Sequence, residues 1–143
     1  MSDGSPFAGQ INAYQTAAQK GDANSIKALY DGADAVALFT EGTSDITPSN
    51  YSAIINGADA IANDLAAHFK SGPNGSNPYA QLTLTEVGYS VEGTRGWSYG
   101  TWYADPNAKT APNGSGSWSA CWVQKSGSWL IQVHSVVPYI SGT

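Results

Sequence analysis

A chain of 143 residues is long enough to bury a core as one domain without disulfides or structural metals. Only 12% of the residues are charged, against about 25% in an average soluble protein. The net charge is −5 with six Lys and Arg residues, which excludes the basic stripe that a nucleic-acid surface needs. No apolar run approaches the roughly 20 residues of a membrane span, so we expect neither nucleic acid nor a membrane as a partner.

Redox and metal chemistry find little support in the sequence. Cys121 is the single cysteine, so no internal disulfide forms, and His68 and His134 are too far apart to suggest a metal site. We predict no metal and no cofactor. The polar start MSDGSPF lacks a signal pattern and favours a cytoplasmic location; export after removal of a signal is the alternative.

The first thirty residues predict a helical hairpin. Ile11 and Tyr14 recur at helical spacing over residues 6–20, and Gly21 is placed to end this helix in a left-handed conformation. Asp22 then predicts the N-cap of a short second helix that ends near residue 31.

The middle of the chain predicts one strand and one helix. Residues 35–40 form a short apolar run typical of a buried strand, and the sequence from there to Ser52 has a loop composition. A third helix is expected over residues 57–70, followed by an exposed loop over residues 72–78.

The second half of the chain predicts an antiparallel meander, because apolar and polar residues alternate with a period of two. Turns are expected at Asn113-Gly114 and Ser126-Gly127. The alternating strand candidates lie near residues 82–87, 97–103, 118–123 and 129–135. No linker or repeat is visible, so residues 1–143 are predicted to form a single domain.

Helices first and strands last indicate an α+β fold, in which about three helices pack against a cone-shaped, curved antiparallel sheet. Two segments resemble the nuclear transport factor 2-like superfamily. They are the run from Tyr14 through Gly21-Asp22 to Tyr30, and the ending Gly127-Ser-Trp129-Leu-Ile131-Gln-Val-His134-Ser135, which is similar to the last strand of SnoaL-like proteins. The resemblance implies a cystatin-like, ketosteroid isomerase-like cone and a homodimer. It leaves the activity open, since this superfamily includes isomerases, cyclases, hydrolases, dehydratases and noncatalytic modules.

The resemblance to ketosteroid isomerases implies a role for Tyr14 as the hydrogen-bond donor to a developing oxyanion. The same comparison places Leu38 where the carboxylate base is expected and Ala120 where a protonated Asp is expected. Neither side chain can act as acid or base, so the usual isomerase machinery is incomplete. Tyr14 is alternatively a core residue whose hydroxyl finds a nearby acceptor.

Other titratable groups are weaker candidates. Replacement bases are Asp34, Glu41, Asp45 and Asp105, although carboxylates in such turns and loops commonly cap the backbone or are solvated. If Ile131 faces a cavity, strict alternation turns His134 to the outer face of the sheet. His68 falls near the end of the third helix, where a cation meets the helix dipole favourably.

Aromatic side chains are the remaining signal, and with Tyr14 they could form a wall that holds a flat apolar ligand. The alternatives are a filled core and an outer face buried in a dimer. The predicted ligand-binding residues are Trp97, Tyr99, Thr101, Tyr103, Trp118 and Trp122.

The sequence therefore predicts a SnoaL-like domain, expected as a homodimer, that binds a small hydrophobic or aromatic molecule. Catalysis of an isomerase, cyclase or hydratase type, independent of a cofactor, is left open. The alternatives are a noncatalytic homodimeric association module and a designed or repurposed scaffold.

Overall fold

The computed structural model of the chain describes residues 4–39, 53–108 and 114–138. Its helices are α1 (Ala8–Lys20), α2 (Ala23–Lys27) and α3 (Ala58–His68), and single 3₁₀ turns occur at Gly32–Asp34, Pro73–Gly75 and Pro106–Ala108. Its strands are β1 (Val36–Phe39), β2 (Ala53–Asn56), β3 (Thr83–Glu92), β4 (Arg95–Tyr103), β5 (Ser115–Lys125) and β6 (Ser128–Pro138). The predicted loop up to Ser52 and the Asn113 half of the predicted turn lie outside the described residues.

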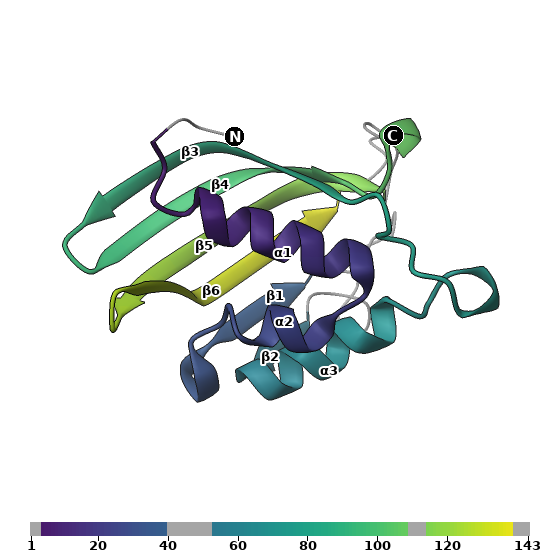
Figure 1. Cartoon of the computed structure of the whole chain (residues 1–143), viewed down its shortest axis with the longest axis horizontal. Coiled ribbons are helices and arrows are strands. Elements are labelled where there is room, and N and C mark those ends of the chain that lie inside the picture. Colours follow the sequence, from purple (N-terminus) through teal and green to yellow (C-terminus); the bar gives the residue numbers. More distant parts are fainter. Residues whose placement is uncertain (1–3, 40–52, 109–113, 139–143) are drawn as a thin grey trace.

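The strands form one open, curved sheet in the order β2-β1-β6-β5-β4-β3. All neighbours are antiparallel except β1 and β6, which run parallel. Figure 1 shows α1 lying across the sheet, with α2 and α3 gathered near β1 and β2. The predicted α+β cone is confirmed. Strand β2 was not predicted, because its four residues are too few to show a period.

The sequence signals at the helix ends act as predicted. Gly21 has φ 68° and its N–H donates to the carbonyls of Ala17 and Ala18, so a left-handed glycine ends α1. Asp22 caps α2, since its Oδ1 accepts from the backbone N–H of Ser25 at 3.1 Å. These two caps produce the sharp hairpin between α1 and α2.

Glutamine side chains attach α1 to strands on both sides of the concave face. Because each bond ends on a backbone group, it fixes the position of the helix without depending on the side chain of the strand residue. The bonds are all 2.8 Å long and join Gln10 to the carbonyl of Trp129, Gln15 to the N–H of Leu84, and Gln19 to the carbonyl of Leu82.

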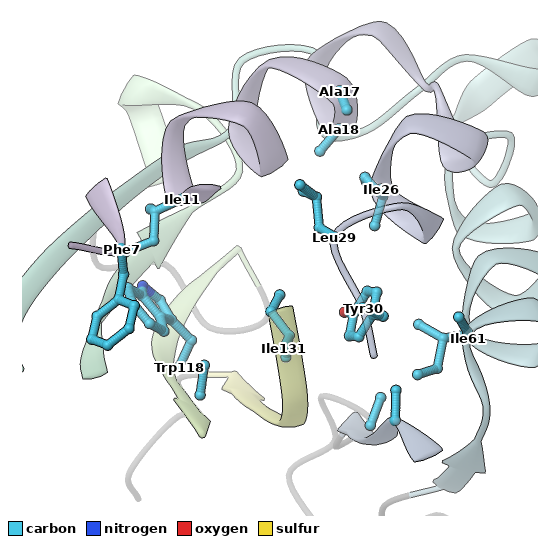
Figure 2. Close-up of a cluster of buried hydrophobic side chains, with 14 of the residues drawn as sticks. Phe7, Ile11, Ala17, Ala18, Ile26, Leu29, Tyr30, Ile61, Trp118 and Ile131 are labelled. Carbon is cyan, nitrogen blue, oxygen red and sulfur yellow. The ribbon is translucent and has the colours of Figure 1, made fainter. Parts of the chain in front are cut away.

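A buried core lies between the helices and the concave, inner face of the sheet. Figure 2 shows this core extending from Phe7 and Trp118 at one end, through Leu29 and Ile131, to Ile61 of α3. The ring of Phe7 stacks on Trp122 with centroids 4.8 Å apart. The helices are therefore held to the sheet mainly by buried apolar and aromatic contacts.

A β-bulge in β6 decides which of its residues face the core. Cys121 pairs with Val133 and Trp122 pairs with Ile131, so two consecutive residues of β5 span three residues of β6 and Gln132 is the extra residue. The bulge shifts the alternation by one position. As a result Ile131 and His134, which have opposite parity in the sequence, are both buried.

Tryptophans on the inner face lie opposite glycines of the neighbouring strand. Trp122 pairs with Gly96 and Trp118 with Gly100. A Cβ atom at Gly100 would overlap the carbonyl oxygen of Thr85 and lie 2.9 Å from the Trp118 ring. The missing side chains therefore give the indoles room to lie over the strands, as is typical of glycine in a strand that another group approaches closely.

Candidate functional site

A cavity of about 300 Å³ lies between α1, α3 and the inner face of the sheet. This volume is at the lower end of the range of small-molecule sites, about 300 to 1,000 Å³. Most of its wall is apolar, and the indole N–H groups of Trp118 and Trp122 are already bonded, to the carbonyl of Thr101 and to the hydroxyl of Ser98. The largest apolar wall residues are Phe39, Phe69, Trp102, Trp118 and Trp122.

Part of the polar wall belongs to a hydrogen-bonded group of three side chains: Tyr14 of α1, His134 of β6, and Tyr30, which lies between α2 and β1. The hydroxyl of Tyr30 lies 2.7 Å from Nδ1 of His134 and 3.4 Å from the hydroxyl of Tyr14. Tyr14 and His134 also line the cavity. The hydrogen bonds of this group have two possible arrangements. In the first, the Tyr30 hydroxyl donates to Nδ1 of His134 and accepts from Tyr14. In the second, Nδ1–H of His134 donates to Tyr30, and Tyr30 donates to Tyr14. In the second arrangement the Tyr14 hydroxyl is free to donate to a ligand.

Burial keeps this group uncharged. It raises the pKa of Tyr14 to about 12 and raises the pKa of Tyr30 well above its ordinary value. Burial also lowers the pKa of His134 to about 4. Each shift has the same cause, since a poorly solvated site disfavours the charged form of each group. At neutral pH the three side chains therefore offer hydrogen bonds without charge.

Helix α3 adds a carboxylate and an imidazole to the cavity wall, from Asp64 and His68. Nδ1 of His68 lies 2.8 Å from the backbone carbonyl of Asp64 and 3.4 Å from its Oδ2. Oδ2 is buried and has no hydrogen-bond partner among the described residues. The described cavity wall therefore carries one carboxylate, whose Oδ2 atom is covered by protein atoms.

The structure divides the predicted aromatic wall between the two faces of the sheet. Trp118 and Trp122 line the cavity with Tyr14. Trp97 and Tyr99 lie on the opposite, outer face and are 44% and 39% exposed. The predicted shared face is wrong because β4 and β5 pair residues of equal parity: Trp97 lies opposite Cys121, and Gly96 lies opposite Trp122.

Thr101 and Tyr103 follow the same parity as Trp97 and do not line the cavity. They border a second hollow, which Trp102 and Gly116 also line. The face of β4 that reaches the cavity is the one that carries Trp102. Whether any of the six predicted residues binds a ligand remains a prediction.

The bulge also overturns the predicted orientation of His134. Strict alternation from Ile131 turns this side chain outward, whereas it lines the cavity beside Ile131 and is only 6% exposed. A bulge of one residue has no clear signature in a run such as Trp129-Leu-Ile-Gln-Val-His, so the sequence alone gives no reason to expect it.

Neither position at which the isomerase comparison implies a carboxylate carries an acidic residue. Ala120 lines the cavity and Leu38 does not. Among the replacement bases, Asp105 accepts a bond from the backbone N–H of Asn107 at 2.7 Å, as a turn cap does, and Asp34 is exposed in a 3₁₀ turn. Glu41 and Asp45 lie outside the described residues.

Most cavity residues were not predicted, among them Asp64, His68 and Trp102. Asp64 and His68 share a helix face with Ile61 and Leu65, so the helical period offered a signal for them. Trp102 could be placed only once the register between β4 and β5 was known.

The described ranges contain neither a metal-binding cluster of side chains nor a membrane-spanning helix. Residues 4–39, 53–108 and 114–138 contain no group of three or more His, Cys, Asp or Glu side chains able to hold a metal ion. Within the same ranges, no helix is long and apolar enough to cross a membrane.

Solved structures identify the fold. No family model matches the sequence, and no curated protein matches it. A putative calcium/calmodulin-dependent protein kinase type II association domain from Thiobacillus denitrificans is 16% identical, with 94% of each chain covered and a TM-score of 0.67. An NTF2-like protein of unknown function from Shewanella baltica is 10% identical, covering 94% of this chain and 92% of its own, with a TM-score of 0.65. Another from Pseudomonas putida is 13% identical, covering 91% and 82%, with a TM-score of 0.63. The chain thus has the NTF2-like fold, with an internal cavity.

Proposed function

We propose that the chain is a SnoaL-like binding domain for a small hydrophobic or aromatic molecule, and that the cavity is its binding site. The observation that carries this proposal is the combination of an apolar wall with a few convergent polar groups. Ligand sites typically combine these features, because apolar walls supply affinity and a small number of polar groups fix the orientation.

The neutral state of the polar group restricts the ligand. Tyr14 and His134 stay uncharged over the physiological range, so they suit a hydroxyl or carbonyl group on the ligand. If the domain also catalyses an isomerase, cyclase or hydratase reaction, Tyr14 would stabilise a developing oxyanion. Asp64, the one carboxylate in the described cavity wall, would be the base.

Filling the cavity tests the proposal. Leu65→Trp places an indole in the wall of a cavity of about 300 Å³, whereas Ala67→Trp places the same group on the exposed face of α3. We expect the first variant to bind a naphthalene-sized neutral probe, 1-naphthalenemethanol, at least about tenfold more weakly, and the second to bind it like the wild type. The dissociation constants can be measured by quenching of tryptophan fluorescence.

A second variant examines the hydroxyl of Tyr14. Tyr14→Phe should weaken binding of the naphthyl alcohol by about five- to tenfold if the Tyr14 hydroxyl forms a hydrogen bond with the ligand, since one neutral hydrogen bond contributes about 1 kcal/mol. Lack of saturable binding to the wild type, or equal affinity in the wild type and Leu65→Trp, would remove the cavity as the site.

A noncatalytic homodimeric association module is the second candidate, and the outer face of the sheet favours it. Ile54 is 67% exposed there, and Trp97 and Tyr99 pack on one another with centroids 4.9 Å apart. The two cross-strand rows at its centre carry no charge: Trp97, Cys121 and Val133 form one row, and Tyr99, Ser119 and Ser135 form the other. Exposed apolar patches of this kind commonly mark association surfaces.

Substitution of two tyrosines with nearly equal exposure distinguishes this candidate function from the first. Tyr99 on the outer face is 39% exposed, and Tyr89, which contacts Phe7 at the inner face, is 40% exposed. If the outer face forms a dimer, Tyr99→Ser should weaken dimerisation about tenfold in sedimentation equilibrium and Tyr89→Ser should not. A monomeric wild type would exclude the association module.

A further inference from the structure

Asp64 lines the cavity, and one of its carboxylate oxygens receives no hydrogen bond from the described residues. Its Oδ2 atom is buried and lacks a hydrogen-bond partner among those residues, while the side chain as a whole is 33% exposed. Native proteins pair nearly all buried polar atoms with protein, water or ligand. Oδ2 itself is covered by protein atoms, so a bound molecule would meet the carboxylate through its exposed part.

His68 does not supply that donor, although it is close. A backbone carbonyl can only accept a hydrogen bond, so the contact of 2.8 Å between Nδ1 of His68 and the carbonyl of Asp64 uses the hydrogen of Nδ1. Oδ2 lies at 3.4 Å from the same nitrogen, outside the direction of that hydrogen bond. The described residues therefore donate no hydrogen bond to Oδ2 of Asp64.

The charges around the cavity favour a cation. No Lys or Arg among the described residues lines it. Lys27 pairs with Asp59 at 2.6 Å, and Lys125 pairs with Asp31 at 2.8 Å. The chain as a whole carries a net charge of −5. An anionic ligand would therefore meet a carboxylate in the cavity wall without a described partner of opposite sign.

The walls favour the same class of ligand. Trp118 and Trp102 are both more than nine-tenths buried and line the cavity. The Trp118 indole nitrogen already donates to the carbonyl of Thr101, and the Trp102 indole nitrogen is covered by protein atoms and has no partner among the described residues, so both rings can offer only their surfaces to a ligand. Indole rings pack well on flat ring systems and attract cations to their faces.

Building on the proposed function, we propose that the ligand is a flat hydrophobic ring system that carries a protonated amine, and that the amine binds the carboxylate of Asp64. Asp64 sets the specificity of the site: it selects a cationic head group over a neutral one and excludes a carboxylate. The apolar walls contribute the part of the affinity that is the same for cationic, neutral and carboxylate head groups.

Three naphthalene probes of nearly equal size test this selection: 1-(aminomethyl)naphthalene, 1-naphthalenemethanol and 1-naphthoic acid. They are cationic, neutral and anionic near pH 7.5. We expect the wild type to bind the amine about tenfold more tightly than the alcohol, a modest ratio because Asp64 is partly exposed, and to bind the acid most weakly. Asp64→Asn should bring the affinity for the amine close to the affinity for the alcohol.

Asp59→Asn is the matched control, because it removes the same charge from the same helix at an exposed position. It should preserve the preference for the amine. A far-ultraviolet circular dichroism spectrum equal to that of the wild type shows that the Asp64 variant is folded. The inference is overturned if the wild type binds the acid as tightly as the amine, if Asp64→Asn keeps the preference for the amine, or if both variants lose it equally. Each of these results leaves the proposed function standing, whereas absence of binding by all three probes contradicts the proposed function itself.

Discussion

The neutral, buried His134 makes the stability of the protein depend on pH in a defined direction. Burial lowers its pKa from 6.5 to about 4, and the side chain is 6% exposed. Between these two pH values the unfolded chain binds a proton at His134 and the folded chain does not. Stability from this residue is therefore complete above about pH 6.5, is lost as the pH falls to about 4, and changes no further below that.

The size of the effect follows from the two pKa values. A difference of about 2.5 pH units, at about 1.4 kcal/mol for each, gives a loss of about 3 kcal/mol in the free energy of unfolding. His134→Gln removes the titrating group and keeps a side chain able to bond the hydroxyl of Tyr30. The free energy of unfolding of the wild type, minus that of the variant, should therefore fall by about 3 kcal/mol between pH 7 and pH 4.

Denaturant unfolding followed by circular dichroism at half-unit steps from pH 4 to pH 8 measures this difference. Carboxylates titrate in both proteins, so their contribution cancels in the subtraction. His68→Gln is the matched control, because it removes the other histidine from a half-exposed position, and the pH dependence assigned to His134 must survive in it. A constant difference between the wild type and His134→Gln would refute a neutral, buried His134.

Three further variants test packing and charge by the midpoint of denaturant unfolding. Gly96→Ala would drive a methyl group into the Phe7 ring and should destabilise the protein by about 1 to 3 kcal/mol; an unchanged midpoint would contradict the observed packing. Gly9→Ala, on α1 with open space around it, should stabilise the protein by about 0.5 kcal/mol, and a large loss would show that this helix face is covered. Lys125→Met leaves Asp31, whose side chain is 6% exposed, without its partner and should cost about 1 kcal/mol, since Lys125 itself is half exposed. No change would mean that water replaces the lysine.

Local signals in the sequence predict the helical half of the fold well. Gly21 and Asp22 set the end of α1 and the start of α2 through bonds within a few residues of each other, so a short window contains the whole cause. Tyr14 was predicted as a site residue from the resemblance to ketosteroid isomerases, and the helical period groups it with Ile11, which also lines the cavity. The period also groups Asp64 and His68 on one face of α3, although it does not reveal that this face borders a cavity.

The sequence by itself determined the order of the helices and of every strand except β2, and the caps that end α1 and begin α2, because each of these depends on neighbours a few residues away. Only the tertiary structure decided which face each strand turns to the cavity. Trp97 faces out and Trp102 faces in because of the register between β4 and β5, and His134 faces in because Gln132 is bulged. Register and bulges arise from pairing between strands that are distant in sequence, and a shift of one residue exchanges the two faces.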